Sequence, residues 1–227
     1  MVSVHSRPDR PITVRGAGIN GYFVAGSDTE VGKTVVAACL VRALDADYWK
    51  PVETGLEQGS DTAEVLRLTG LPADRLHPSA YALQVPLSPH EAARLEGVEI
   101  ALDAFVLPAT GRPLVVEGAG GLMVPLNRRH FMIDLIERLG LPVILVVRSG
   151  LGTINHTLLS LDALRSRSLP VEGVILNGPL NPANRAAIEY YGEVRVLAEI
   201  PRLETIDRKT VSRLSAKFTP VLKGKLA

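Results

Sequence analysis

Short apolar runs that end at a glycine or a polar residue recur along the chain. Four of them span residues 22–25, 114–116, 143–147 and 171–176, and they are continuous rather than alternating, with many Val and Ile residues. A strand of this kind is buried on both faces, as strands are in a parallel sheet that helices cover on both sides. The pattern therefore predicts a buried parallel sheet.

Segments with helical character lie between these runs. The pattern predicts helices at residues 35–44, 62–68, 133–139, 153–167 and 184–191. Another helix is expected to start at Ser88, where Ser at the cap, Pro at the first helical position and Glu at the third form a capping box. Strands that alternate with helices favour an α/β fold, here a single doubly wound, mostly parallel sheet flanked by helices. Ligands of such sheets sit outside the carboxyl ends of the strands.

The length of 227 residues allows one large domain or two small ones. We expect a single α/β domain over residues 21–227, preceded by an N-terminal extension over residues 1–20 that could be flexible. Hydrophobic residues make up 46% and charged residues 22%, an ordinary globular composition that argues against a disordered chain. The net charge is only +1, so no bulk field would steer the chain onto a polyanion, and nucleic acid is not an expected partner.

The compartment can also be predicted from the sequence. The longest apolar runs, residues 35–41 and 141–147, are well short of the about 18 to 20 residues that span a bilayer. The N-terminal stretch lacks the apolar segment of a secretory signal, and a lone cysteine, Cys39, is typical of a reduced compartment without disulfides. We therefore expect a cytoplasmic protein that crosses no membrane. The locally basic tail over residues 209–225 is expected to be a solvated surface helix and coil.

The most informative motif is Gly-Ser-Asp-Thr-Glu-Val-Gly-Lys-Thr at residues 26–34, between a predicted strand and a predicted helix. Its glycines let backbone N–H groups turn toward one concavity, and the next helix offers unpaired N–H groups and the positive end of its dipole to a phosphate. Lys33 would reach the terminal phosphates, and Thr34 would offer its hydroxyl to a bridging magnesium ion. Five residues separate Gly26 from Gly32, where the standard motif has four. The motif predicts a nucleotide site without identifying the reaction.

Other charged residues follow further predicted strands. Lys50 comes where a second parallel strand would end, and it could neutralise charge on a transferring phosphoryl group, although a single lysine is usually a surface residue. Asp61 and Glu117 are carboxylates of the kind that a magnesium site between phosphates needs. Asp61 could equally be a helix cap. Glu117 ends an apolar strand and leads into three nearby glycines, which indicates a backbone that approaches a ligand.

Taken together, these residues resemble the dethiobiotin synthetases, the biotin-pathway enzymes that close a cyclic urea on a diamine. The five-residue gap in the loop is this family's own form. The resemblance covers the chain from about residue 21 to residue 203. It is carried in order by residues 26–34, Lys-Pro-Val-Glu-Thr-Gly at 50–55, Ser-Pro-His at 88–90, Glu-Gly-Ala-Gly-Gly at 117–121, Leu-Pro-Val-Ile-Leu-Val-Val at 141–147 and Gly-Thr-Ile-Asn-His at 152–156.

The resemblance implies a phosphate-loop NTPase fold and a reaction that depends on ATP and Mg²⁺. That reaction joins 7,8-diaminononanoate, CO₂ and ATP to give dethiobiotin, ADP and phosphate. An amine takes up CO₂ as a carbamate, the carbamate oxygen attacks the γ-phosphate, and the neighbouring amine closes the ring on the mixed anhydride. The implied partners are these small molecules and a second copy of the chain, in a homodimer with the substrate site at its interface.

The same resemblance assigns a role to residues that match the family's motifs. Lys50 is the expected catalytic lysine, together with Lys33 and Thr34, and the expected magnesium ligands are Thr34, Asp61 and Glu117. Nucleotide contacts are expected from Glu30, Val31, Gly32, Lys33, Thr34, Val35, Asp61, Glu117, Gly118, Ala119, Gly120, Asn177, Gly178, Pro201, Arg202 and Leu203. Substrate contacts are expected from Thr54, Gly150, Leu151, Thr153, Asn155 and Tyr190, of which the segment 150–155 would reach the substrate's carboxylate from the other subunit.

The residues alone leave three other functions open. The first is a partition or cofactor-maturation ATPase, a class whose loop carries an extra lysine that this chain lacks. The second is a ligase that activates carboxylates for amide formation, which usually adds a domain with a nucleophilic cysteine, and 227 residues leave no room for it. The third is a nucleotide-binding module without chemistry, which the two lysines and two carboxylates together disfavour.

Overall fold

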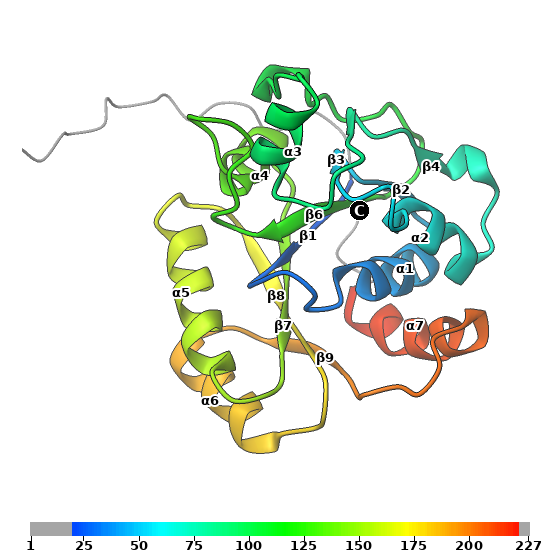
Figure 1. Ribbon diagram of the computed structural model, residues 1–227. Coiled ribbons are helices and arrows are strands. Elements are labelled where there is room, and N and C mark those ends of the chain that lie inside the picture. Colours follow the sequence, from blue (N-terminus) through cyan, green and yellow to red (C-terminus); the bar gives the residue numbers. More distant parts are fainter. Residues whose placement is uncertain (1–19, 223–227) are drawn as a thin grey trace, which may run out of the picture.

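A computed structural model of the protein describes residues 20–222. The predicted extension over residues 1–20 lies outside the described residues except for Asn20. The described chain forms a seven-stranded sheet, a two-stranded sheet and helices that connect the strands (Figure 1). The elements are β1 (Gly21–Gly26), α1 (Lys33–Leu44), β2 (Asp47–Trp49), β3 (Val52–Glu53), α2 (Asp61–Thr69), β4 (Leu76–His77), β5 (Tyr81–Ala82), α3 (Pro89–Leu95), β6 (Leu114–Gly121), α4 (Met132–Leu139), β7 (Val143–Arg148), α5 (Thr153–Arg165), β8 (Val171–Asn177), α6 (Pro182–Gly192), β9 (Val196–Ile200) and α7 (Arg208–Leu222), with short 3₁₀ turns at Ala73–Arg75 and Leu102–Ala104.

The large sheet has the strand order β4-β2-β6-β1-β7-β8-β9, and all its neighbouring strands run parallel. Strand β1 lies in the middle of the sheet. The strands β2, β4 and β6 lie on one side of it, and the later strands β7, β8 and β9 lie on the other side. This order confirms the predicted doubly wound sheet. The two short strands β3 and β5 also pair in parallel, in a sheet of their own.

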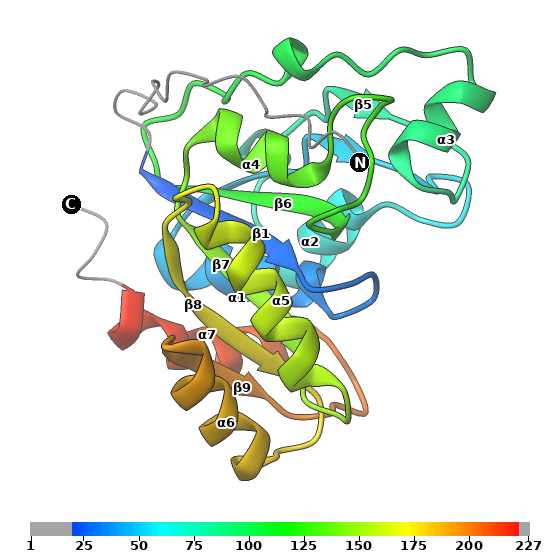
Figure 2. The same ribbon diagram turned by 90° about the vertical axis from the view of Figure 1, so that its left-hand side faces the viewer.

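Helices cover both faces of the large sheet. Helices α1, α2 and α7 pack on the face to which Tyr22 and Val24 of β1 contribute, and α4, α5 and α6 pack on the face of Phe23 and Ala25. In Figure 1, α5 and α6 lie to the left of the strands and α1, α2 and α7 to the right, and in Figure 2 α5 and α6 are in front of the strands and α1 is behind them. Because successive residues of a strand point to opposite faces, a strand that is buried on both faces must be apolar throughout.

The carboxyl ends of the strands lie level along one edge of the sheet. Gly26 of β1 is in register with Gly121 of β6, and Arg148 of β7 is in register with Asn177 of β8. Strand β2 ends one residue before Lys50. The loops that follow these strands therefore leave the sheet on the same side, where ligands of such sheets bind.

Helix α7 differs from its prediction. The tail is not a solvated helix, because Val211, Leu214 and Phe218 are fully or almost fully buried in the same apolar cluster as α1. Its basic side chains, such as Arg213 and Lys217, are exposed. Their charge pattern correctly marks the outer face of the helix but gives no sign of the apolar stripe on the inner face.

Helix α3 begins at Pro89 as predicted, but the capping box does not form. The Ser88 hydroxyl lies 3.0 Å from Nδ1 of His90, and the Glu91 carboxylate pairs with Arg94 at 2.6 Å. Ser88 and Glu91 therefore each contact a neighbouring side chain and not the backbone N–H group that each would accept from in a capping box.

Helix α1 is buried along most of its length, from Val36 to Val41. Cys39, the one cysteine of the sequence, lies in this stretch with no exposed surface, and burial raises the pKa of its thiol to about 12. None of the helices between residues 20 and 222 is long and apolar enough to span a membrane.

Candidate active site

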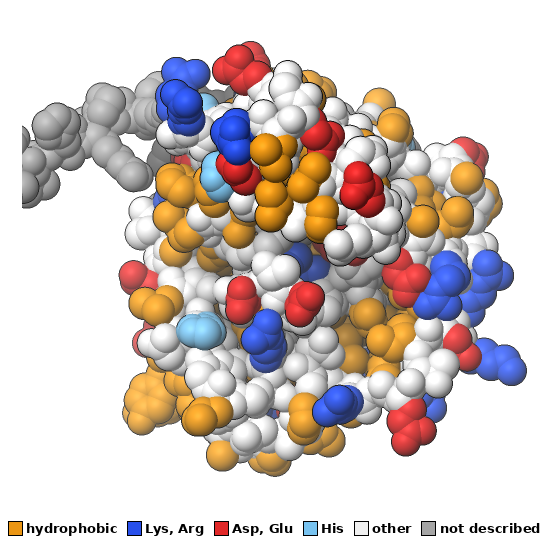
Figure 3. Space-filling model, in the orientation of Figure 1, with side chains coloured by type: hydrophobic (Ala, Val, Ile, Leu, Met, Phe, Trp, Pro, Cys, Tyr) orange, Lys and Arg blue, Asp and Glu red, His pale blue; other side chains and the backbone are white. Residues whose placement is uncertain are grey.

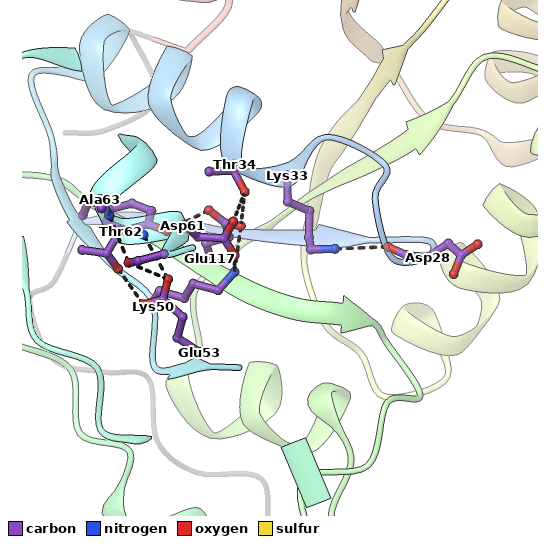
Figure 4. Close-up of polar contacts among 11 residues, drawn as sticks. Asp28, Lys33, Thr34, Lys50, Glu53, Asp61, Thr62, Ala63 and Glu117 are labelled. Carbon is purple, nitrogen blue, oxygen red and sulfur yellow. Dashed lines mark hydrogen bonds and ion pairs between the residues drawn. The ribbon is translucent and has the colours of Figure 1, made fainter. Parts of the chain in front are cut away.

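The phosphate loop connects β1 to α1. It ends at Gly32, whose φ of 92° is a left-handed conformation that favours glycine. A Cβ atom at this position would lie only 2.0 Å from Nδ2 of Asn177. Lys33 is the first residue of α1, and its Nζ donates to the carbonyl oxygen of Asp28 at 3.1 Å, which turns the lysine side chain back over the loop (Figure 4). The loop therefore has the glycine, the lysine and the helix start that the sequence predicts.

Four polar side chains from separate elements meet beside this loop. The hydroxyl of Thr34 in α1 lies 2.9 Å from Oδ1 of Asp61 in α2 and 3.0 Å from Oε1 of Glu117 in β6. The ammonium of Lys50, which follows β2, lies 2.5 Å from Oδ2 of Asp61 and 2.9 Å from Oε1 of Glu117. Figure 4 shows the lysine and the two carboxylates pointing toward one another.

Burial makes these contacts strong. Glu117 has no exposed surface, and the hydroxyl of buried Tyr48 donates to its second oxygen, Oε2, at 2.8 Å. The Lys50 side chain is only 4% exposed. Burial by itself would lower the pKa of Lys50, but the carboxylates of Glu117 and Asp61 outweigh it and hold the pKa well above its usual value. Lys50 is therefore an ammonium ion at neutral pH.

The two other charged groups of the site respond to burial differently. Burial would raise the pKa of Asp61, but Lys50 and the hydroxyl of Thr34 outweigh it, so the pKa lies below its usual value. The pKa of Lys33 is lowered to about 8, mainly because the side chain is buried. The carboxylate of Glu117 raises this pKa and the ammonium of Lys50 lowers it further, and burial outweighs the effect of Glu117. Asp61 is thus a carboxylate at neutral pH, ready to act as a metal ligand.

The donor set fits a magnesium ion bound to a nucleotide. Thr34, Asp61 and Glu117 offer only oxygen atoms, which Mg²⁺ prefers, and two carboxylates are typical of sites that Mg²⁺ shares with substrate phosphates and water. Within residues 20–222 no three His, Cys, Asp or Glu side chains are grouped so that they could hold a metal ion. The described residues therefore suit a metal that completes its shell with phosphate, as the sequence predicts, and not a cage made by the protein alone.

A cavity of about 410 Å³ lies beside the phosphate loop and is lined by the predicted catalytic residues and many of the predicted nucleotide residues. Its lining includes Lys50, Thr54 and the nucleotide-loop and carboxylate residues Glu30, Gly32, Lys33, Thr34, Val35, Asp61, Glu117, Ala119 and Gly120. A larger adjoining cavity of about 1010 Å³ shares Thr54 and Asp61 and extends over α2 to the start of α3. Figure 3 shows acidic and basic side chains gathered near a hollow on this face.

Val31 and Gly118, two of the predicted nucleotide contacts, make structural contacts within the fold. Val31 is buried, and its carbonyl oxygen accepts a hydrogen bond from Nδ2 of Asn177 at 2.9 Å. Gly118 is buried in β6, where a Cβ atom would lie 2.9 Å from the ring of Phe23. This glycine is explained by packing against the neighbouring strand.

The remaining residues that are predicted to contact the nucleotide lie together at the ends of β8 and β9. The N–H group of Gly178 donates to the carbonyl oxygen of Ile200 at 2.9 Å, which brings Asn177 next to the segment 201–203. Pro201 and Leu203 are half-buried and Arg202 is exposed. These residues form a second group, joined to the phosphate loop by the bond from Asn177 to Val31.

The predicted substrate residues other than Thr54 are not in either cavity. Gly150 and Leu151 follow β7, and Thr153 is buried at the start of α5, with its hydroxyl bonded to the carbonyl oxygen of Arg148. Asn155 is exposed on α5. Tyr190 on α6 is 77% exposed and packs edge to face against the ring of Tyr191. The described chain therefore carries these residues on a separate surface.

Tyr48 and Glu53 belong to the surroundings of the site, although the sequence did not single them out. Tyr48 lies in β2, and nothing in the sequence around it indicates that its hydroxyl reaches Glu117. Glu53 lies within the motif Lys-Pro-Val-Glu-Thr-Gly and directly follows an apolar residue of a strand, so a buried acidic residue could have been suspected there.

Comparisons with known proteins extend these observations. A family model described as an AAA domain matches residues 20–210. The chain is 57% identical over 196 residues to the "ATP-dependent dethiobiotin synthetase BioD" of Paramagnetospirillum magneticum, covering 86% of this chain and 95% of that protein. It is 50% identical over 198 residues to a protein of the same name from Rhodopseudomonas palustris, covering 87% and 93%. It is also 57% identical over 208 residues to the "Biotin biosynthesis bifunctional protein BioCD" of Bordetella avium, and it spans only 44% of that longer protein.

Solved structures show the same architecture. A ParA family ATPase from Chlorobium tepidum matches 91% of this chain and 92% of its own, with a TM-score of 0.50 and 15% identity. A protein from Borrelia burgdorferi, described as a plasmid partition protein and bound to AMPPNP, matches with a TM-score of 0.54 and 12% identity over 91% of this chain and 99% of its own. At such low identity the likeness concerns the fold alone, and it confirms the predicted phosphate-loop NTPase architecture.

Proposed function

This chain belongs to the ATP-dependent dethiobiotin synthetase family, and on that premise we propose that it joins 7,8-diaminononanoate, CO₂ and ATP to give dethiobiotin, ADP and phosphate. We further propose that it acts in the cytoplasm, since its one cysteine suits a reduced compartment.

One arrangement supports this chemistry most directly. The ammonium of Lys50 is held between Asp61 and Glu117, beside the phosphate loop. A fixed positive charge at this point suits a reaction whose transition state spreads negative charge over a transferring phosphoryl group.

The nucleotide is bound by the loop and by the ends of the neighbouring strands. Lys33 and the N–H groups at the start of α1 hold the phosphates, together with Glu30, Val31, Gly32, Val35 and the segment Gly118, Ala119 and Gly120. Asn177, Gly178 and the residues Pro201, Arg202 and Leu203 surround the base, where the amide of Asn177 can donate to and accept from a purine edge. Magnesium, held by Thr34, Asp61 and Glu117, would supply charge neutralisation between the phosphates.

The protein's task is to hold the carbamate and the γ-phosphate in line. One amine of the substrate adds to CO₂ and loses a proton to give a carbamate. A carbamate oxygen then attacks the γ-phosphorus and ADP leaves. This phosphorylation is needed because a bare carbamate oxygen would be a poor leaving group in the next step. The second amine attacks the carbamate carbon, phosphate leaves and the ring closes. Lys50 contacts carbamate and γ-phosphate as a permanent cation, and Thr54 contacts the substrate.

The carboxylate of the substrate is bound by a second copy of the chain. Gly150, Leu151, Thr153 and Asn155 surround the start of α5, where unpaired N–H groups favour an anion. The hydroxyl and the N–H group of Thr153 are both bonded to backbone carbonyl oxygens, those of Arg148 and Gly150, so neither can donate to the substrate without giving up that bond. We propose that one protomer offers this segment, with Tyr190, to the substrate that lies on the phosphate loop of its partner.

The deciding experiment measures ADP and product together. The purified chain is incubated with ATP and Mg²⁺, with 7,8-diaminononanoate and bicarbonate each present or omitted, and dethiobiotin is identified by mass. We expect ADP and dethiobiotin to form in equal amounts only when every component is present.

Two outcomes would contradict the proposal. ATP hydrolysis that ignores the diamine, without a cyclic urea, would move the function to a switch ATPase or another ligase. Hydrolysis that survives Lys33→Ala would show that a contaminant produces the ADP, so this variant is the control for the preparation.

A further inference from the structure

Glu53 is a buried carboxylate that the proposed reaction does not use. It ends β3, and only 4% of the residue's surface is exposed. Both of its oxygens accept hydrogen bonds: Oε1 from the hydroxyl of Ser60 at 2.9 Å and from the N–H group of Thr62 at 3.2 Å, and Oε2 from the hydroxyl of Thr62 at 3.1 Å. A buried charge is costly unless it is bonded in this way, so the fold has built these contacts around it.

The residues that Glu53 holds are the two neighbours of Asp61. Ser60 precedes Asp61 as the cap of α2, where its hydroxyl also accepts from the N–H group of Ala63 at 3.1 Å, and Thr62 follows Asp61 in the first turn. The residue on either side of Asp61 is thereby tied to β3, Ser60 through its hydroxyl and Thr62 through its hydroxyl and its N–H group. Figure 4 shows Glu53, Thr62 and Asp61 in this relation.

The geometry does not make Glu53 a metal ligand itself. Its oxygens are occupied by Ser60 and Thr62, and in the described part of the chain it forms no group with Asp61 and Glu117 that could hold a metal ion. Its negative charge at the start of a helix is favourable, which accounts for the stability of the arrangement.

We propose that Glu53 is a positioning residue that fixes the carboxylate of Asp61 for the metal bound with ATP. The stretch from Lys50 to Glu53 then acts on Asp61 twice, because Lys50 contacts its Oδ2 and Glu53 holds the residues on both sides of it. This inference rests on the proposed role of Asp61 as a magnesium ligand.

A purely structural cap is the competing explanation, and the two differ in what they change. If Glu53 only caps α2, its loss lowers the temperature of unfolding and leaves metal affinity as it was. If it positions Asp61, its loss weakens metal binding by about 10-fold or more, the range typical of residues that orient a metal ligand.

The test measures the dissociation constant of Mn²⁺, which replaces Mg²⁺ as a paramagnetic probe. The full-length protein, in excess over a non-hydrolysable ATP analogue, is titrated with Mn²⁺ and free Mn²⁺ is followed by electron paramagnetic resonance. Glu53→Ala should raise the dissociation constant by about 10-fold or more. Glu53→Gln should bring it back to within about threefold of the wild type, because the amide oxygen still accepts from Ser60 and Thr62. In Glu53→Ala, turnover should recover at saturating Mg²⁺.

Glu57→Gln is the matched control, because Glu57 is an exposed acidic residue in the loop that joins β3 to α2. It should not change Mn²⁺ affinity. Unchanged affinity in a folded Glu53→Ala variant would overturn the proposal, as would equal weakening in Glu53→Ala and Glu53→Gln. If Glu53→Ala does not fold, Thr62→Val decides, because it removes one of the three bonds. It should weaken Mn²⁺ binding, and unchanged affinity would overturn the proposal.

Asp61→Asn separates this inference from the proposed function. Weakened Mn²⁺ binding in Asp61→Asn with unchanged binding in Glu53→Ala would refute only the role of Glu53. Unchanged binding in Asp61→Asn would refute the metal role of Asp61, and the role of Glu53 with it.

Discussion

Lys50 and Lys33 face Asp61 and Glu117, so two cationic side chains oppose two carboxylates beside the phosphate loop. The charges of the site are already balanced by the protein's own groups. When a nucleotide arrives with its cation, Lys50 can exchange its carboxylate partners for the γ-phosphate without moving to another part of the molecule. Its raised pKa keeps it an ammonium ion at neutral pH, which suits the proposed role as a fixed charge and not that of a base.

Lys50→Ala tests this role. We expect turnover to fall by about 10² to 10³, the usual loss for one fixed electrostatic contact. The affinity for ATP should change little, because Lys33 and the loop remain. Steady-state kinetics and titration with a fluorescent nucleotide measure the two quantities, and nucleotide binding also reports that the variant is folded although Glu117 has lost its buried partner. Turnover at the wild-type rate would remove Lys50 from the mechanism.

Glu117→Gln tests the metal role of the second carboxylate. The amide replaces a charged ligand with a neutral one, so the Mg²⁺ concentration for half-maximal turnover should rise by about 10-fold. Glu57→Gln, at an exposed position in the loop after β3, is the control and should leave the magnesium titration unchanged. An unchanged titration in Glu117→Gln itself would contradict the assignment.

At the scale of elements, the sequence predicts best what is long and continuously apolar. Strands β1, β7 and β8 agree with their predicted ranges to within a residue or two, because a strand buried on both faces must be a continuous apolar run. Strands β3, β4 and β5 have two residues each, too few to produce a pattern. The site follows the same division: the loop and Glu117 are visible as motifs, whereas the contact of Tyr48 arises only when β2 pairs with β6, and those of Glu53 only when the loop after β3 folds back to the start of α2.

Strand β2 contains a buried polar residue that joins the edge of the sheet to its neighbours. Asp47 pairs with Arg75 at 2.8 Å and accepts from the hydroxyl of Thr110 at 2.6 Å. Burial would raise the pKa of Asp47, but Thr110 and Arg75 outweigh it and hold the pKa below its ordinary value of 3.8. A carboxyl group whose pKa is lowered by folding stabilises the protein above its unfolded pKa, and this contribution is lost as the pH falls through the folded pKa.

Asp47→Asn should therefore lower the free energy of unfolding at pH 7 by about 1 to 3 kcal/mol. The difference in free energy of unfolding between the variant and the wild type should shrink as the pH falls below 3.8 and through the lower pKa of the folded protein, because the wild-type carboxyl group then takes up a proton and becomes neutral, as the asparagine is. Urea unfolding of both proteins at pH 7 and at about pH 3 measures this. A difference that is the same at both pH values would mean that the charge of Asp47 is not what stabilises the edge of the sheet.

At the scale of the whole molecule, the proposed site is incomplete in one chain. The residues assigned to the substrate's carboxylate lie around α5 and α6, outside both cavities near the phosphate loop. Exposed apolar side chains gather in the same region: Leu151, Leu159, Leu180, Tyr190 and Tyr191. An apolar surface next to binding residues is what a homodimer interface would leave exposed in a single chain.

Leu159→Asp tests the shared site, because Leu159 is 61% exposed on α5 and is not itself a proposed substrate contact. We expect the variant to be a monomer that binds ATP normally and has lost most of its affinity for 7,8-diaminononanoate. Sedimentation and calorimetry measure the two properties. Val106→Asp, at another exposed apolar position, should leave both unchanged. A monomer that binds the diamine normally would end the proposal of a shared site.

Chemical labelling of the buried cysteine of α1 can report how often the structure around this helix opens. Cys39 has no exposed surface and a pKa of about 12, so a thiol reagent can modify it only when the packing around α1 opens. The labelling rate therefore measures how often the helix that carries Lys33 and Thr34 opens. If ATP binds to that helix in its closed position, as proposed, saturating nucleotide should slow the labelling, and mass spectra taken over time would follow nucleotide binding through the native cysteine.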